Sequence, residues 1–170
     1  MKLLPRWWRS HFLHVEFGVA VLGSLAFAGW VELSGGAGVV NTLLNGNRGM
    51  IYGTFASIFG SLLGFAITAA SIILGFSGLS RLAIIRESAQ YPTLWRVFKA
   101  TIRALGLATI VSLIGLILSH ETTLFRWVLH VSVFASLLAC LRLIRCVWVL
   151  EKTIGLLTAP SKARPSSSEE

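Results

Sequence analysis

A run of 24 residues without a charged side chain, Tyr52–Gly75, limits the possible folds of this chain more than any other feature. A helix needs about 20 apolar residues to cross the hydrocarbon core of a bilayer, so this run is long enough to span a membrane. Further apolar stretches follow residues 12, 104 and 124. The sequence therefore predicts an all-α integral membrane protein with four transmembrane helices.

The composition of the whole chain agrees with this prediction. Of the 170 residues, 55% are hydrophobic and only 13% are charged, whereas roughly 25% of a soluble domain is charged. The mean hydropathy of +0.76 is typical of a protein that crosses the membrane several times. No charged or amphipathic stretch reaches the ~50 residues of a separate soluble domain, so we expect one membrane unit.

Turn residues, charges and prolines divide the chain into nine segments. Ser80 can cap a short amphipathic helix between the second and third spans, and Tyr91-Pro92 ends it. The fourth helix contains no breaker and is longer than a bilayer requires, so we expect its last turns to extend into the cytoplasm. The expected segments are a basic, aromatic interfacial N-terminus (1–11), the first span (12–33), a periplasmic loop (34–49), the second span (50–76), a cytoplasmic amphipathic connector (77–92), the third span (93–119), a periplasmic turn (120–123), the fourth span with its extension (124–157) and a disordered tail (158–170).

Basic residues predict the orientation of these spans. Three precede the first span, five lie between the second and third spans, and five follow from Arg142 onward. Only Arg48 and Arg126 fall on the other side. Because cytoplasmic loops are rich in Lys and Arg, we expect both termini in the cytoplasm, and we explain the net charge of +8 by topology and not by nucleic-acid binding. The size and span number are typical of small bacterial inner-membrane proteins.

Small residues form a regular stripe along the second span. Their spacing alternates between three and four residues, which places them on one face of a helix, while bulky side chains such as Phe59, Leu62 and Leu63 occupy the opposite face. Such a stripe either packs closely against another helix or lines a water-filled pore. A matching stripe in the third span, Gly106–Ser119, offers a packing partner within the chain. The candidate stripe residues with this spacing are Thr54, Ser57, Ser61, Gly64, Thr68, Ser71 and Gly75, and Gly60 widens the stripe.

Polar residues at the two ends of the spans form further candidate sites. The Gly- and Asn-rich loop before the second span is a candidate outer mouth, formed by Asn41, Asn45, Asn47 and Arg48. Basic residues on the cytoplasmic side are expected to set the topology and contact anionic lipid headgroups. These are Arg81, Arg86, Arg96, Lys99 and Arg145.

Glu16 is the one carboxylate that we expect inside the bilayer. A buried charge in a membrane requires a partner, and Arg103 and Arg142 lie at about the right depth for an ion pair with it. The chain contains no H-E-x-x-H, G-x-S-x-G or phosphate-binding loop motif. His11 and His14 lack further metal ligands, and His120 and His130 are poorly placed to share a haem. We therefore expect neither an enzyme nor a bound metal or cofactor.

Two functions agree with these patterns. The first is a homo-oligomeric channel or pore whose wall includes the second span. The second is a non-catalytic scaffold or assembly subunit, whose stripes pack helices and whose cytoplasmic segments bind a membrane-protein or cytoplasmic partner. We expect the protein to lie in the lipid bilayer and to form a homo-oligomer, and the sequence leaves the choice between the two functions open.

Overall fold

The computed structural model describes residues 6–76, 91–119 and 126–158, and all secondary structure in these ranges is helical. The helices are α1 (Arg6–Leu33), α2 (Gly36–Leu44), α3 (Arg48–Phe76), α5 (Tyr91–Leu118) and α6 (Arg126–Thr158). The candidate membrane spans, judged by length and composition, are Phe12–Leu33, Arg48–Ile72, Leu94–Leu118 and Trp127–Glu151. The prediction of a helical protein with four apolar spans is confirmed.

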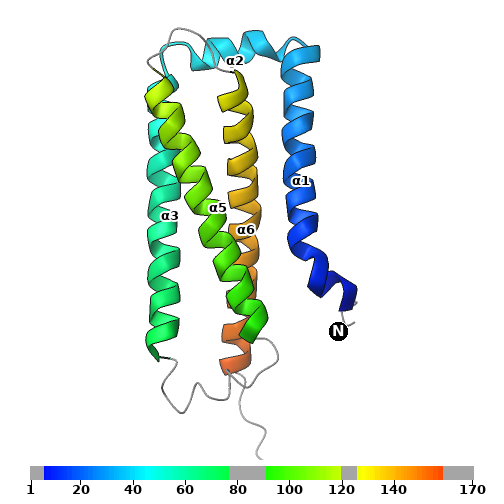
Figure 1. Ribbon diagram of the computed structural model, residues 1–170, viewed down its shortest axis with the longest axis vertical. Coiled ribbons are helices and arrows are strands. Elements are labelled where there is room, and N and C mark those ends of the chain that lie inside the picture. The colour runs from blue at the N-terminus through cyan, green and yellow to red at the C-terminus, as the bar shows by residue number, and fades with distance from the viewer. Residues whose placement is uncertain (1–5, 77–90, 120–125, 159–170) are drawn as a thin grey trace, which may run out of the picture.

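The long helices stand side by side with alternating direction, as Figure 1 shows. α3 packs against α5, α5 against α6, and α6 against α1. α5 is the most enclosed of them, because 39% of the residues in its span are buried, whereas only 11% are buried in the span of α3. α3 therefore stands at the edge of the bundle and leaves much of its surface to the surroundings.

The short helix α2 lies across one end of the bundle (Figure 1), within the segment that we expected to be a loop. The left-handed backbone of Gly35 (φ 74°) turns the chain between α1 and α2, and Gly46 (φ 77°) occupies the turn that leads into α3. Val40 and Leu44 on the inner face of α2 pack against Val31 of α1. These apolar contacts hold α2 across the ends of the longer helices.

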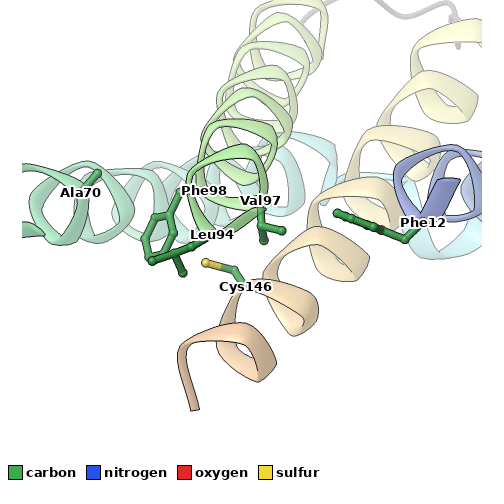
Figure 2. Close-up of a cluster of buried hydrophobic side chains, with 6 residues drawn as sticks. All are labelled: Phe12, Ala70, Leu94, Val97, Phe98 and Cys146. Atoms are coloured by element: carbon green, nitrogen blue, oxygen red, sulfur yellow. The ribbon is translucent and has the colours of Figure 1, made fainter. Parts of the chain in front are cut away.

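At the opposite end, buried side chains from all four long helices form a cluster, which Figure 2 shows. Half of its members come from α5, whose first turns are covered by α3 on one side and by α6 on the other. The cluster consists of Phe12, Ala70, Leu94, Val97, Phe98 and Cys146. It fixes the beginning of α5 between its two neighbours.

Several predicted segments differ in extent from the helices. Residues 6–11 belong to α1 and precede the candidate span Phe12–Leu33, and α3 begins at Arg48, two residues before the expected start. α6, with 33 residues, is the longest of the described helices. The amphipathic helix expected at 77–92 lies almost wholly outside the described residues, as do the turn at 120–123 and the tail beyond residue 158.

The small residues of α5 allow α3 to approach it closely. A Cβ atom added at Gly115 would lie 2.6 Å from Cδ1 of Tyr52, so the tyrosine ring of α3 occupies the space that a side chain on α5 would need. Ser112, one turn earlier, is also buried, and a Cβ at Gly60 of α3 would meet Thr109 of α5 at 3.8 Å. The small residues of the third span therefore form the surface of α5 against which α3 packs.

We predict that Gly115→Ala destabilises the protein by about 1–3 kcal/mol, since the added methyl forces the Tyr52 ring to move. The matched control is Gly106→Ala on the same helix, where no atom lies within 4 Å of the added Cβ. This control should lose no stability, because Ala favours a helix by up to ~1 kcal/mol over Gly. Unfolding in mixed detergent micelles, followed by circular dichroism, measures both; equal stability of the two variants would contradict the Tyr52–Gly115 contact.

Candidate functional site

The small residues of α3 lie on the face that points away from the bundle. Thr54, Ser57, Ser61, Gly64, Thr68 and Ser71 are all exposed, and Gly60 is half-buried. The side chain position of Gly75 lies outside the described residues. The stripe is thus an open surface along most of the length of α3.

The opposite face of α3 makes the contacts with α5. Phe59 is buried against Leu105 and Ala108 of α5, and Leu62, Leu63 and Ala66 pack around the same cluster. The third span is therefore a neighbour of the second, as its stripe suggested, but it contacts the bulky face and does not cover the small one. Apart from Gly60, which faces Thr109 of α5, the described residues of the candidate stripe are exposed.

Larger apolar side chains flank the small residues. Ile58, Phe65 and Ile72 are exposed and recur every seven residues, so they form a ridge along one side of the stripe. Ile67 and Leu74, also exposed and seven residues apart, form the ridge on the other side. On the outer surface of α3, small residues consequently lie between two rows of larger apolar side chains, an arrangement that accepts a second helix at close distance.

Hydroxyl groups in the stripe interact with their own helix. Thr54 Oγ1 donates to the Met50 carbonyl at 2.8 Å, and Thr68 Oγ1 donates to the Gly64 carbonyl at 2.9 Å. Ser71 Oγ does the same toward Ile67 at 2.9 Å. These i to i−4 bonds satisfy the hydroxyl protons inside the helix, so the oxygens remain as acceptors on an otherwise small and apolar surface.

The residues of the candidate outer mouth occupy different positions. Asn41 is on α2, Asn45 caps its C-terminus and Asn47 follows, and all three side chains are exposed at the end of the bundle where α2 lies. Arg48 begins α3 one turn before the buried Tyr52 and on the same helix face. The arginine is therefore placed on the bundle side of α3, away from the stripe.

A second polar site joins α1 to α6 near the other end of the bundle. Glu16 of α1 is only 6% exposed. Its Oε2 lies 3.2 Å from Nε of Arg142, and its Oε1 accepts a hydrogen bond from Nε of Arg145. Two guanidinium groups of α6 thus share one carboxylate of α1, which leaves a net positive charge at a largely buried site.

Neighbouring groups fix the two arginines in place. The Arg142 Nη2 atom donates to the Leu13 carbonyl at 3.5 Å, and the Arg145 guanidinium lies 4.4 Å from the centroid of the Phe12 ring. A cation over an aromatic ring gains roughly 0.5–2 kcal/mol, depending on desolvation. Both contacts reach residues of the first turns of α1, so the cluster fixes that end of α1 on α6.

The sequence named one of the two partners that the structure brings to Glu16. Arg142 was expected there as an alternative to Arg103, and Arg103 is exposed on α5. Arg145 was assigned to lipid headgroups, whereas the structure places it in the ion cluster. Its spacing of three residues from Arg142 was the available signal, because residues i and i+3 share a helix face.

The remaining candidates are dispersed. Arg96 and Lys99 are exposed on α5, with Lys99 Nζ 5.8 Å from the centroid of the Trp95 ring, and Arg81 and Arg86 lie outside the described residues. His130 Nε2 is 4.0 Å from the Glu32 carboxylate. Within the described ranges, no group of three or more His, Cys, Asp or Glu side chains is arranged to hold a metal ion.

No family model, curated protein or solved structure matches the chain. The arguments for its function therefore rest on the outward stripe of α3 and on the contacts between its helices.

We predict that Glu16→Gln destabilises the protein by about 3–5 kcal/mol, because it leaves two largely buried guanidinium groups without a counter-charge. Glu151→Gln is the matched control, since Glu151 is exposed near the end of the α6 span and its loss should change stability little. The free energy of unfolding in mixed micelles tests both variants. A wild-type value for Glu16→Gln would show that the cluster does not hold α1.

Proposed function

We propose that the protein forms a homo-oligomeric membrane channel in which the stripe of α3 faces the symmetry axis. The observation that carries this proposal is the orientation of the stripe, which is exposed on the face of α3 opposite its contacts with α5. A surface of small residues between apolar ridges gives little contact to lipid and allows another helix to approach closely. Copies of α3 arranged around an axis would bury this surface.

The chemistry of the stripe suits the wall of a modest pore. Serine and threonine oxygens provide acceptors that keep a narrow channel wetted, and the glycines and serines leave room at the axis. Rings of fixed charge are absent from the described part of the stripe, because Tyr52–Gly75 contains no charged residue. The pore would therefore select ions mainly by the polar and charged residues at its two mouths.

Each end would contribute a different surface. Asn41, Asn45 and Asn47 are exposed where α2 lies, and we propose that they surround the periplasmic mouth. The exposed Arg96 and Lys99 of α5 lie toward the opposite end, which the charge distribution assigns to the cytoplasm. Both termini would then be cytoplasmic, and anionic lipids would contact these basic residues in the inner membrane of a bacterium.

A scaffold or assembly subunit is the second candidate, and the hydrogen bonds of the stripe favour it. Thr54, Thr68 and Ser71 donate to carbonyl groups of their own helix, which makes the stripe less polar than its sequence implies. A surface of small residues suits close packing of a helix from a second copy or from another membrane protein. The two candidate functions therefore differ in one structural respect. In a scaffold the helix that faces the stripe packs directly against it, whereas in a channel the facing copies of α3 leave an open pore between them.

Cross-linking at Ser61 distinguishes these arrangements. In a background with Cys140→Ala and Cys146→Ala, we expect Ser61→Cys to be linked between copies in the membrane, and Ile110→Cys on the exposed face of α5 to remain unlinked. A disulfide needs Cα atoms within about 7 Å and so reports closed packing. Linking only by a longer bis-maleimide reports facing helices held apart, as in a pore. Linking by neither reagent would exclude a homo-oligomer around this face.

Conductance tests the channel directly. Purified protein in planar bilayers should conduct ions, and Ser61→Leu should lower the single-channel conductance because the larger apolar side chain narrows and dries the wall. Ser61→Ala is the control, since it keeps the volume small and should leave the conductance near the wild-type value. A stable oligomer that does not conduct would contradict the channel and leave the assembly role.

A further inference from the structure

An apolar hollow lies between α3 and α6, separate from the stripe. Ile51, Tyr52 and Phe55 of α3 form one wall, and residues of α6 from Leu129 to Cys140 form the other. Leu44, the last residue of α2, closes it at the end where α2 crosses the bundle. Its volume is about 250 Å³, whereas a helix about 10 Å in diameter and 16 Å long fills more than ~1,000 Å³. The hollow accommodates a chain of atoms and excludes a helix.

The length of the hollow corresponds to the thickness of one leaflet of a bilayer. The twelve residues from Leu129 to Cys140 rise roughly 16 Å along α6, and one half of a hydrocarbon core is about 15 Å thick. The hollow extends from the end of the span where Leu129 lies, near the beginning of α6, toward its middle. Phe55 and Cys140 are exposed at its edge, so it opens toward the lipid.

A cationic group lies at the end of the hollow where α2 crosses. Arg48 does not line the hollow, but it is one turn from the lining residue Tyr52 on the same face of α3 and toward the end where α2 crosses. The Arg48 Nε atom is buried and has no hydrogen-bond partner among the described residues. Guanidinium groups bind phosphate with paired, charge-assisted hydrogen bonds, so this group is suited to a phosphate that lies above the apolar wall.

We propose that this hollow is a binding site for an anionic phospholipid of the leaflet on the α2 side, with one acyl chain between α3 and α6 and its phosphate at Arg48. The apolar lining, the one-leaflet length and the unpartnered guanidinium nitrogen each match a different part of this ligand. Because the site lies on the bundle side of α3, it does not depend on the function proposed for the stripe. Bound lipid would fill the gap beside Tyr52 and support the contact of α3 with the rest of the protein.

Native mass spectrometry of the purified full chain tests the proposal. Detergent-solubilised protein is titrated with phosphatidylglycerol or with phosphatidylcholine, and the bound lipid is counted. We expect one phosphatidylglycerol to bind in preference to phosphatidylcholine. Arg48→Gln should weaken phosphatidylglycerol binding about tenfold, as expected for the loss of one charge-assisted contact. The control Arg103→Gln, an exposed arginine of α5, should bind as the wild type does.

A second variant and a second readout separate binding from folding. Val133→Trp fills the hollow from α6 and should abolish binding of either lipid, while circular dichroism reports whether the variant folds. In the unmodified chain, phosphatidylglycerol should slow alkylation of the exposed Cys140 thiol at the inner end of the hollow, and Arg48→Gln should remove this protection. Equal lipid binding by wild type and Arg48→Gln, or retained binding by folded Val133→Trp, would overturn the proposal.

Discussion

Helices surrounded by lipid gain nothing from burying apolar surface against one another, so each pair must associate through close packing or polar contacts. This constraint explains the two contacts on which the arrangement of the bundle depends. Tyr52 of α3 fits onto Gly115 of α5, where any side chain would prevent the approach. Glu16 of α1 is held by Arg142 and Arg145 of α6. The first pair of helices is held by the steric fit of a ring against a glycine, and the second by ion pairs that are largely shielded from solvent.

The two contacts hold α1 and α3 to different extents. α1 packs on α6 and on α2, and its ion cluster fixes it near one end while the α2 contacts fix the other. α3 contacts α5 along its bulky face and presents the whole opposite face to its surroundings. An unpaired stripe of small residues on the most exposed span is the feature that the channel and the assembly proposals both use. The hollow beside α6 lies on another side of the same helix.

Much of the fold could be predicted from the sequence, and the candidate sites could be predicted only in part. The uncharged run at Tyr52–Gly75 and the positions of the other apolar stretches predicted four spans, because the thickness of a bilayer sets the length of a helix that crosses it. The helix at Gly36–Leu44 lies in the segment that was predicted to be a periplasmic loop, since nine residues carry a weak periodic signal. The partner of Glu16 was limited to two arginines by depth, but depth alone does not include Arg145 or exclude Arg103.

The sequence by itself determined that the chain is helical, that four segments can cross a membrane and that one face of the second span is small. These properties depend on local composition and on the 3.6-residue period of a helix. Only the tertiary structure decided which face of that helix meets its neighbour. Small and bulky faces can both pack, and Gly115 offered a recess that the Tyr52 ring fills, so the bulky face turned inward. The small face was left outside, where a second copy or another protein can reach it.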